Sequence, residues 1–335
     1  MKLIEYKELK FYNTFRVSAR ARYFMEVSQE EDIPRLLEFV NRKQIPLLIL
    51  SGGSNVLFTR DFEGVVALIR FRGIQTVMEN GDISRITALA GTDWEELVDY
   101  AIRNQLSGIE NLTLIPGQAG SSPIQNIGAY GVELDQVFYS LEAIDMTDGS
   151  RRIFYKPDCG FGYRKSIFKE ERGRFLILRV TLELRKHFVP VIQYGDIRKY
   201  LERTGEGVTL AGVRDAIRMI RRSKLPQEGQ AGSAGSFFKN PVVEATFFDK
   251  LCVDFHGLSG FPQSDGVKIP AAWLIEQCGW KGFRKGDAGV WPLQPLVLVN
   301  YGNASGDDIY TLARDIMASV RDRFGISLEP EVNIY

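Results

Sequence analysis

The sequence predicts an α+β fold, and three observations support this fold class. An amphipathic helical segment is followed by strand-like segments, and this order recurs along the chain. No G-x-G-x-x-G sequence opens a helical segment, which disfavours a Rossmann arrangement for a dinucleotide. A long glycine-rich segment at 107–135 is typical of a functional loop inside a domain.

The elements are expected from the spacing of apolar residues. Residues 30–43 predict the first helix and residues 93–105 the second. The apolar residues on one face of these helices are Ile33, Leu36, Leu37, Val40, Trp94, Leu97, Val98, Ala101 and Ile102. Strands are expected at 45–50, 64–70, 84–90, 138–146, 151–155 and 175–185. Further helices are expected at 211–222, 268–279 and 305–323, with a glycine-rich loop at 228–236.

The length predicts more than one domain, because 335 residues exceed the roughly 250–300 that a single core usually holds. We expect boundaries near 74 and near 222. These separate a first lobe at 1–74, a second lobe at 75–222 and a smaller domain at 223–324. Residues 325–335 are expected to return to the second lobe.

The composition is that of an ordinary globular protein, with 44% hydrophobic and 25% charged residues. Lysine plus arginine (42) equal aspartate plus glutamate (42), so no net field recruits nucleic acid or an acidic membrane. No apolar run approaches the roughly 20 residues of a spanning helix, and the first residues lack a signal-peptide stretch. We therefore expect a cytoplasmic protein.

Metal-ligating and nucleophilic residues are scarce. Three widely spaced cysteines and two histidines form neither a disulfide framework nor a zinc site. No Walker A loop, G-x-S-x-G or H-E-x-x-H sequence is present. We expect no metal and no Ser-His or Cys-His catalysis.

Two segments are suited to a cofactor. In Ser51-Gly52-Gly53-Ser54-Asn55, paired glycines can turn successive N–H groups toward one pyrophosphate, although a tight turn is favoured for this segment alone. Residues 115–131 are uncharged, small and dense in backbone donors, which suits a flavin. The alternative there is an Ω-loop, but few side chains are available to pack such a loop on itself.

Three polar residues are ambiguous when taken singly. Arg164 can clamp a carboxylate, and Ser236, beside Phe237 and Phe238, can deliver a proton. The ordinary alternatives are surface charges at Arg164 and Glu331 and a turn role for Ser236.

Taken together, these segments resemble the UDP-N-acetylenolpyruvoylglucosamine reductase family over nearly the whole chain. Seven segments follow the family's order, namely Asn13-Thr14-Phe15, Ser51–Phe58, Gly108–Leu134, Phe161–Lys169, Tyr194-Gly195-Asp196, Gly235–Pro241 and Leu328–Val332. The loop with Tyr194 resembles the substrate-covering loop of the family's first subtype.

The resemblance implies a two-lobed FAD-binding region of the vanillyl-alcohol-oxidase and p-cresol-methylhydroxylase type, plus a smaller α+β substrate domain. It also implies a monomer with non-covalent FAD and with NADPH as reductant. The implied reaction converts UDP-N-acetylglucosamine enolpyruvate to UDP-N-acetylmuramate in peptidoglycan precursor synthesis. Hydride passes from the flavin to the enolpyruvyl methylene carbon.

The resemblance also implies residue roles. Arg164 and Glu331 polarise the substrate carboxylate, the latter only when it carries a proton, and Ser236 protonates the carbanion. The expected substrate contacts are Tyr163, Tyr194, Lys224, Asn240 and Gln294. The expected cofactor contacts are Ser51, Gly52, Gly53, Ser54, Asn55, Pro116, Gly117, Gly120, Ser121, Ser122, Ile124 and Gly128. One departure is Asn333, where an arginine is expected, and it concerns substrate contacts near the C-terminus.

Two rival interpretations make different predictions. An oxidase of the same fold commonly attaches FAD through His or Cys, but neither residue type falls in the expected flavin loops. A non-catalytic binding protein predicts loss of Ser236, Arg164 or Glu331, and all three are present.

Overall fold

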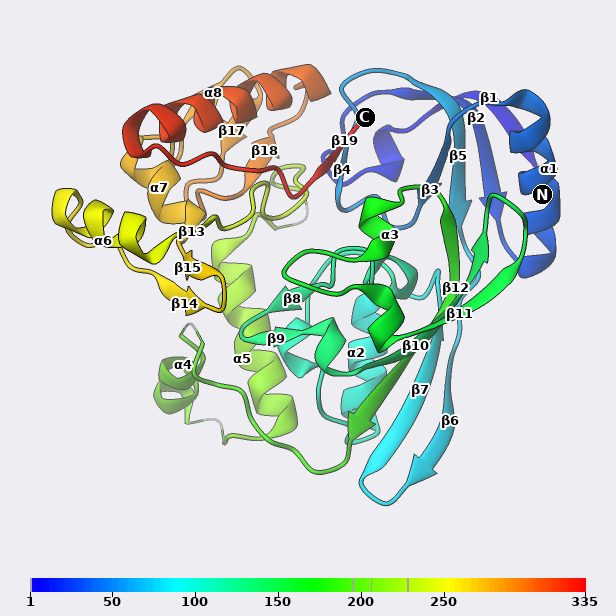
Figure 1. Cartoon of the computed structure of the whole chain (residues 1–335), viewed down its shortest axis with the longest axis horizontal. Coiled ribbons are helices and arrows are strands. Elements are labelled where there is room, and N and C mark those ends of the chain that lie inside the picture. The colour runs from blue at the N-terminus through cyan, green and yellow to red at the C-terminus, as the bar shows by residue number, and fades with distance from the viewer. Residues whose placement is uncertain (1, 195, 206, 228) are drawn as a thin grey trace. The chain divides into compact units, whose positions relative to one another are not determined.

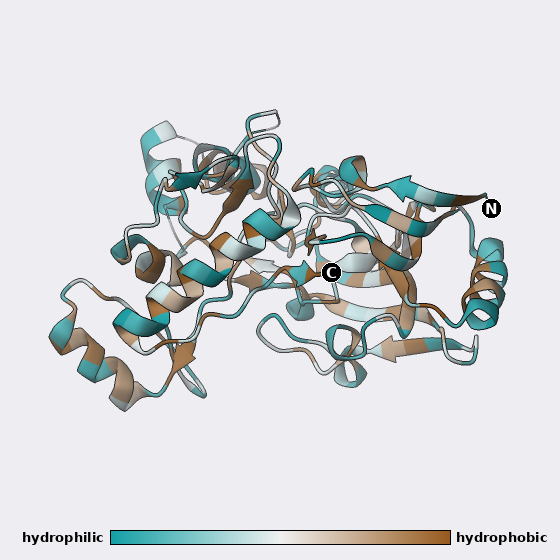
Figure 2. Cartoon of the chain, turned by 90° about the horizontal axis from the view of Figure 1, so that it is seen from above, coloured by the Kyte–Doolittle hydropathy of each residue, from teal (hydrophilic) through white to brown (hydrophobic). Residues whose placement is uncertain are grey.

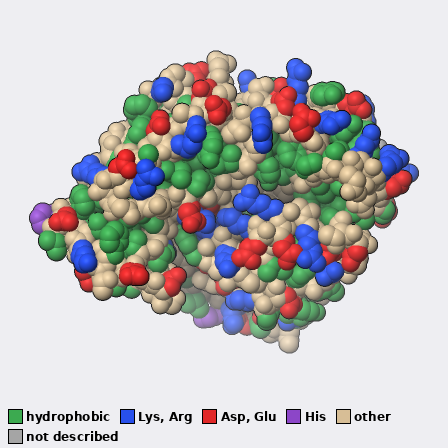
Figure 3. All heavy atoms as spheres, turned by 45° about the horizontal axis from the view of Figure 1, so that its top comes forward, with side chains coloured by type: hydrophobic (Ala, Val, Ile, Leu, Met, Phe, Trp, Pro, Cys, Tyr) green, Lys and Arg blue, Asp and Glu red, His purple; other side chains and the backbone are tan. Residues whose placement is uncertain are grey.

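A computed structural model describes residues 2–194, 196–205, 207–227 and 229–335 (Figure 1). The chain divides into two compact units. The first comprises Met1–Lys7, Ala21–Gly53 and Phe62–Arg222, and the second comprises Glu8–Arg20, Ser54–Asp61 and Ser223–Tyr335. Basic and acidic side chains are interspersed over the face seen in Figure 3, in keeping with their equal numbers.

The first unit contains a four-stranded sheet in the order β1-β2-β5-β3. Its strands are β1 (Leu3–Glu8), β2 (Arg20–Val27), β3 (Leu47–Leu50) and β5 (Phe62–Ile69). Both β2 and β3 pair with β5 in parallel. Helix α1 (Ile33–Lys43) follows the 3₁₀ turn Glu30–Asp32 and buries Ile33, Leu36 and Phe39 in a core with β2 and β5.

The same unit also contains a five-stranded antiparallel sheet in the order β11-β10-β12-β7-β6. Its strands are β6 (Ile74–Asn80), β7 (Ile83–Leu89), β10 (Phe138–Asp145), β11 (Arg151–Tyr155) and β12 (Phe175–Arg185). The accompanying helices are α2 (Trp94–Arg103), α3 (Ile167–Glu170), α4 (Ile197–Thr204) and α5 (Leu210–Lys224). The apolar face of α2 packs against Ile86, Val180 and neighbouring buried residues.

The second unit combines short sheets with three helices. The sheets are β13 (Val242–Val243), β15 (Gly266–Lys268) and β14 (Phe261–Gln263), and then β16 (Arg284–Lys285), β17 (Ala288–Val290) and β18 (Leu298–Asn300). The helices are α6 (Ala245–Asp254), α7 (Ala271–Gln277) and α8 (Gly306–Phe324). Helix α8 begins at a capping box of Ser305 and Asp308 and ends at Gly325 in the left-handed conformation. Hydrophilic and hydrophobic residues alternate along the helices in Figure 2, as expected of helices that bury one face.

The structure contains the helices and strands expected from apolar spacing, with α7 starting later than expected because Pro270 precedes it. It also contains β1, β2, β6, α4 and α6, which the spacing did not indicate. The domain boundaries at 74 and 222 stay predictions.

The C-terminal segment takes a different partner from the expected one. Instead of returning to residues 75–222, β19 (Asn333–Ile334) pairs in parallel with β4 (Val56–Leu57). Among the residues that the structure describes, β19 is the strand that pairs with β4, and it satisfies backbone groups of β4.

Candidate functional site: two glycine-containing loops and the Ser236 segment

The Ser51–Asn55 loop follows β3 and approaches the second glycine-containing loop closely. A Cβ at Gly52 would lie 3.3 Å from the Cα of Gly117. Gly53 has a φ of 63°, a conformation that glycine adopts without strain. The two segments expected to hold the cofactor therefore meet through backbone without intervening side chains, which suits a ligand that needs close backbone approach.

The loop at 107–135 is built from 3₁₀ turns and a short hairpin. The turns are Glu110–Leu112, Ala119–Ser121 and Leu134–Gln136, and the hairpin consists of β8 (Gly128–Ala129) and β9 (Val132–Glu133). Three non-glycine residues of the loop have positive φ, namely Leu114, Asn126 and Tyr130. Such conformations are uncommon outside glycine and persist only where surrounding structure holds them.

Backbone contacts hold the centre of this loop. The Trp94 amide donates to the Gly117 carbonyl at 3.0 Å, and the Gly120 amide donates to the Ala90 carbonyl at 2.9 Å. A Cβ at Gly120 would lie 2.5 Å from the Cβ of Ala90, so only glycine fits there. This close approach to Ala90 explains the glycine by packing alone.

Asn126 is the residue that sequence reasoning missed in this loop. It is fully buried, and its amide nitrogen donates to Glu133 at 3.1 Å and to the Gly162 carbonyl at 3.2 Å. Its amide oxygen accepts from the Asp135 backbone at 3.0 Å. An asparagine among loop glycines was the only available signal, because these partners lie up to 36 residues away.

Helices α2 and α5 anchor the start of the loop. The Glu95 carboxylate accepts hydrogen bonds from the Thr113 hydroxyl (2.7 Å) and the Leu114 amide, and it pairs with Arg218. Arg221 donates from Nη2 to the Leu114 carbonyl at 3.2 Å, and burial lowers the pKa of this guanidinium. The loop is thus held from two helices before it reaches Pro116.

The loop serines use their hydroxyls internally. Ser121 donates to the Gln118 carbonyl at 2.8 Å, and buried Ser122 donates to the Ala119 carbonyl at 2.7 Å. The Ile124 carbonyl accepts from the Ser166 hydroxyl at 2.6 Å. These hydroxyls satisfy carbonyls of the loop itself and so help to fix its shape.

Arg164 lies in a tight turn with Tyr163 and reaches the same loop. Its φ is 54°, and the backbones of Gly162 and Lys165 exchange two hydrogen bonds across the turn. The Arg164 guanidinium donates to the carbonyls of Gly128 (2.6 Å) and Asn126 (3.4 Å) and lies 5.2 Å from the Tyr163 ring. Arg164 is therefore held beside the 115–131 loop.

Tyr194 packs against the turn of the β8–β9 hairpin. A Cβ at Gly131 would lie 2.5 Å from the Tyr194 ring, while the tyrosine remains 45% exposed. Beside it, burial raises the pKa of Tyr130. Gly195 of the same motif lies outside the described residues.

In the second unit, the segments that carry Ser236 and Glu331 lie side by side. The Glu331 amide donates to the Phe237 carbonyl at 2.7 Å, and the Lys239 amide donates to the Glu329 carbonyl at 2.9 Å. Ser236 also forms an isolated antiparallel β-bridge with Val297. In the described part of the chain, the Ser236 hydroxyl makes no hydrogen bond, so it is available to a substrate.

Two of the remaining expected substrate contacts already accept hydrogen bonds within the protein. The amide oxygen of Asn240 accepts from the Ala271 backbone at 2.9 Å, at the start of α7. The side-chain oxygen of Gln294 accepts from the Leu296 amide at 3.4 Å. Lys224 is the last residue of α5.

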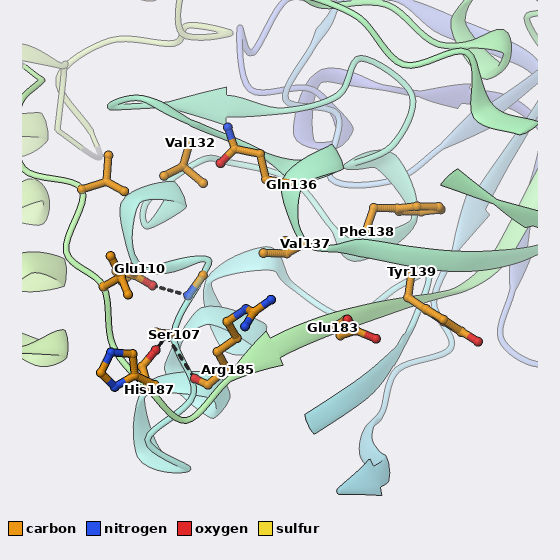
Figure 4. Close-up of a pocket in the computed structure, with 13 residues that line it drawn as sticks. Ser107, Glu110, Val132, Gln136, Val137, Phe138, Tyr139, Glu183, Arg185 and His187 are labelled. Carbon is orange, nitrogen blue, oxygen red and sulfur yellow. Dashed lines mark hydrogen bonds between the residues drawn. The ribbon is translucent and has the colours of Figure 1, made fainter. Parts of the chain in front are cut away.

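A separate cavity of about 230 Å³ opens in the first unit, and none of the expected site residues lines it (Figure 4). At its wall the Ser107 hydroxyl donates to the carbonyls of Arg185 and His187, and the Gly108 amide donates to the Glu110 carboxylate at 2.6 Å. Burial raises the pKa of Glu110. The cavity is lined in part by the start of the 107–135 loop and by Val132 of β9.

The described residues contain no group of three or more His, Cys, Asp or Glu side chains that could hold a metal ion. Among the same residues, no helix combines the length and apolar character needed to cross a bilayer.

Comparisons with known proteins define the class first. Residues 21–154 match the model of an FAD binding domain, and residues 226–335 match that of the UDP-N-acetylenolpyruvoylglucosamine reductase C-terminal domain. The chain is therefore an FAD-dependent oxidoreductase with an α+β fold, and the fold class expected from the sequence is confirmed.

Relatives identify the family. The chain is 45% identical over 333 residues to the UDP-N-acetylenolpyruvoylglucosamine reductase of Pseudomonas putida, covering 99% of this chain and 98% of that one. It is 46% identical to the Pseudomonas aeruginosa reductase, covering 100% and 99% of the two chains. The chain belongs to the UDP-N-acetylenolpyruvoylglucosamine reductase family. The solved reductase of Thermus caldophilus has the same fold, with a TM-score of 0.67 at 24% identity over 100% of this chain and 98% of that one.

Proposed function

We propose that this protein reduces UDP-N-acetylglucosamine enolpyruvate to UDP-N-acetylmuramate, with NADPH as the reductant of its FAD. The family membership supports the reaction, and the observation that carries the site is the pair of adjoining segments with Ser236 and Glu331. We further propose that the protein acts as a cytoplasmic monomer in peptidoglycan precursor synthesis.

The residues of the two loops fit FAD. We assign the pyrophosphate to Ser51–Asn55, where positive φ at Gly53 turns backbone donors toward one side. We assign the flavin to residues 116–128, an uncharged segment whose shape Ser121 and Ser122 hold by hydrogen bonds within the loop. Bound there, FAD supplies the hydride for the enolpyruvyl methylene carbon.

Side chains of the protein would stabilise the charge on the substrate carboxylate and donate the proton. Arg164 supplies a guanidinium for the substrate carboxylate, and its two carbonyl acceptors hold it in place before substrate binds. Glu331 can donate to that carboxylate only when protonated. The Ser236 hydroxyl supplies the proton that completes the reduction. A free hydroxyl is a poor acid, so this step needs a neighbouring group or an ordered water that returns a proton to the serine oxygen.

The substrate's nucleotide part would meet polar side chains. We assign Tyr194, Lys224, Asn240 and Gln294 to its diphosphate and uridine, and Tyr163 to the region that nicotinamide and substrate share. Tyr194 is the best suited to cover a ligand, since it is 45% exposed and rests on a glycine.

The decisive experiment is anaerobic mixing of the purified protein with NADPH, followed by UDP-N-acetylglucosamine enolpyruvate, while the flavin absorbance is recorded. Bleaching by NADPH and recovery with the enolpyruvyl substrate are expected. Bleaching without recovery would remove the substrate assignment and keep the flavin reductase. A protein that binds no FAD would contradict both.

A further inference from the structure

The side chain of Asn333 forms an unusual double contact at the C-terminal strand. Its Nδ2 donates to the Asn55 carbonyl at 3.1 Å, and its own backbone amide donates to the same oxygen at 3.1 Å. A carbonyl oxygen has two lone pairs, and here one residue supplies donors to both. The side chain that replaces the expected arginine is therefore committed to the backbone of Asn55.

Asn55 returns a contact to the same segment. Its Nδ2 donates to the Glu331 carbonyl at 3.3 Å. The Glu331 amide donates on its other side to the Phe237 carbonyl at 2.7 Å. The backbone of Glu331 is thus fixed between the Ser236 segment and Asn55, which is the last residue of the Ser51–Asn55 loop.

We propose that Asn333 and Asn55 form a clamp that couples FAD binding at the Ser51–Asn55 loop to the placement of Glu331. Asn333 is a positioning residue in this proposal, because it acts through Asn55. A ligand that orders the loop fixes the Asn55 carbonyl and side chain, and the clamp transmits this order to the strand that carries Glu331. By linkage, an ordered strand favours FAD binding to the same extent.

The clamp rests on the assignment of the loop to FAD and does not depend on the roles proposed for Ser236 or NADPH. The clamp concerns cofactor binding and not hydride transfer, because through it the C-terminal strand contributes to the affinity for FAD. The backbone pairing of β19 with β4 remains when the Asn333 side chain is changed, so the side-chain contribution can be measured separately.

The first test uses the unaltered full chain with and without FAD. The Asn333 amide donates to Asn55 and the Tyr335 amide donates to Leu57, so hydrogen exchange at these two amides reports on the strand. We expect FAD to slow their exchange by about fivefold or more, the scale of one hydrogen bond. Equal exchange rates in the two states would overturn the clamp whether or not any variant folds.

The second test compares FAD dissociation constants of variants. Asn333→Leu and Asn333→Asp are close in size to asparagine and lack its donor, so each is expected to weaken FAD binding about fivefold and to reduce the exchange effect. Asn41→Leu, at an exposed position of α1, is the matched control and should bind FAD normally.

Gly52→Val separates failure of the clamp from failure of the loop assignment, because its side chain would meet Gly117. Unchanged FAD affinity in Gly52→Val would remove the loop assignment and the clamp together. Weakened binding there, with normal binding in both Asn333 variants, would overturn the clamp alone.

Discussion

Ser236 is the residue whose proposed role separates the two half-reactions. Ser236→Ala is expected to slow substrate reduction by roughly two to three orders of magnitude, the usual effect of losing one transition-state donor. Flavin reduction by NADPH should change far less, because it needs no proton from this hydroxyl. Anaerobic stopped-flow absorbance measures each half-reaction.

Ser233→Ala is the matched control for this prediction. Ser233 lies in the same segment and uses its backbone amide to bond the Thr14 carbonyl. Both half-reactions should survive the change. Equal slowing of the two half-reactions by Ser236→Ala would show that the serine is not the proton donor.

Asp145 governs acid stability at the scale of a single residue. Its side chain is fully buried beside Arg174 and Arg152, at 3.0 and 2.9 Å. Burial acts to raise the pKa of Asp145, but hydrogen bonds from Arg174 and Thr147 outweigh it and lower the pKa from 3.8 to about 2. The charged form therefore stabilises the fold above the unfolded pKa, and this stabilisation disappears as the pH falls from 4 through about 2.

Asp145→Asn is expected to remove about 2 kcal/mol of stability at neutral pH and to flatten the loss of stability between pH 4 and 2. Thermal unfolding midpoints across this pH range measure the slope. Asp322→Asn is the control, since Asp322 is an exposed carboxylate that also pairs with an arginine, Arg321, at 3.2 Å. An unchanged slope in Asp145→Asn would contradict the assignment.

At the scale of the element, the loop at 115–131 depends on contact between backbones. Gly120→Ala is expected to destabilise the protein by about 1–3 kcal/mol, because the new methyl group overlaps Ala90. It should also weaken FAD binding, since the loop must move away from β7. Fluorescence titration of the protein with FAD measures the dissociation constant.

Gly207→Ala serves as the control for this loop prediction. A Cβ there would lie 3.7 Å from Thr209, which is an ordinary contact. FAD affinity should be preserved in Gly207→Ala. Comparable affinity in Gly120→Ala would show that the loop tolerates displacement or does not meet the flavin.

At the scale of the whole molecule, we expect FAD to be held without a covalent bond. Burial raises the pKa of the Cys159 thiol to about 12, so it is not a thiolate at neutral pH. Cys252 and Cys278 lie in the second unit, outside both cofactor loops. Denaturation followed by ultrafiltration should release all the flavin into the filtrate, whereas yellow colour retained with the chain would favour the covalent oxidase alternative.

Three features could be predicted from the sequence alone, namely the strongly periodic elements, the two glycine-containing loops and the family. Helices α1 and α8 repeat apolar residues at helical spacing. This pattern is local, so it predicts a helix without knowledge of the tertiary structure. The two loops could be predicted because glycine-containing, uncharged segments allow the backbone to approach a neighbour closely. Strand β2 was not foreseen, because buried residues crowd its centre without strict alternation.

The hydrogen-bond partner of each polar group could not be predicted from the sequence, because it depends on the tertiary structure. The tertiary structure assigned the Ser121 and Ser122 hydroxyls to the loop itself, Asn126 to Gly162, and Asn333 to Asn55. It also paired β19 with β4 rather than with residues 75–222. The physical reason is that a hydrogen bond between residues as many as 278 positions apart depends on how the chain packs, and it leaves no periodic pattern in the sequence.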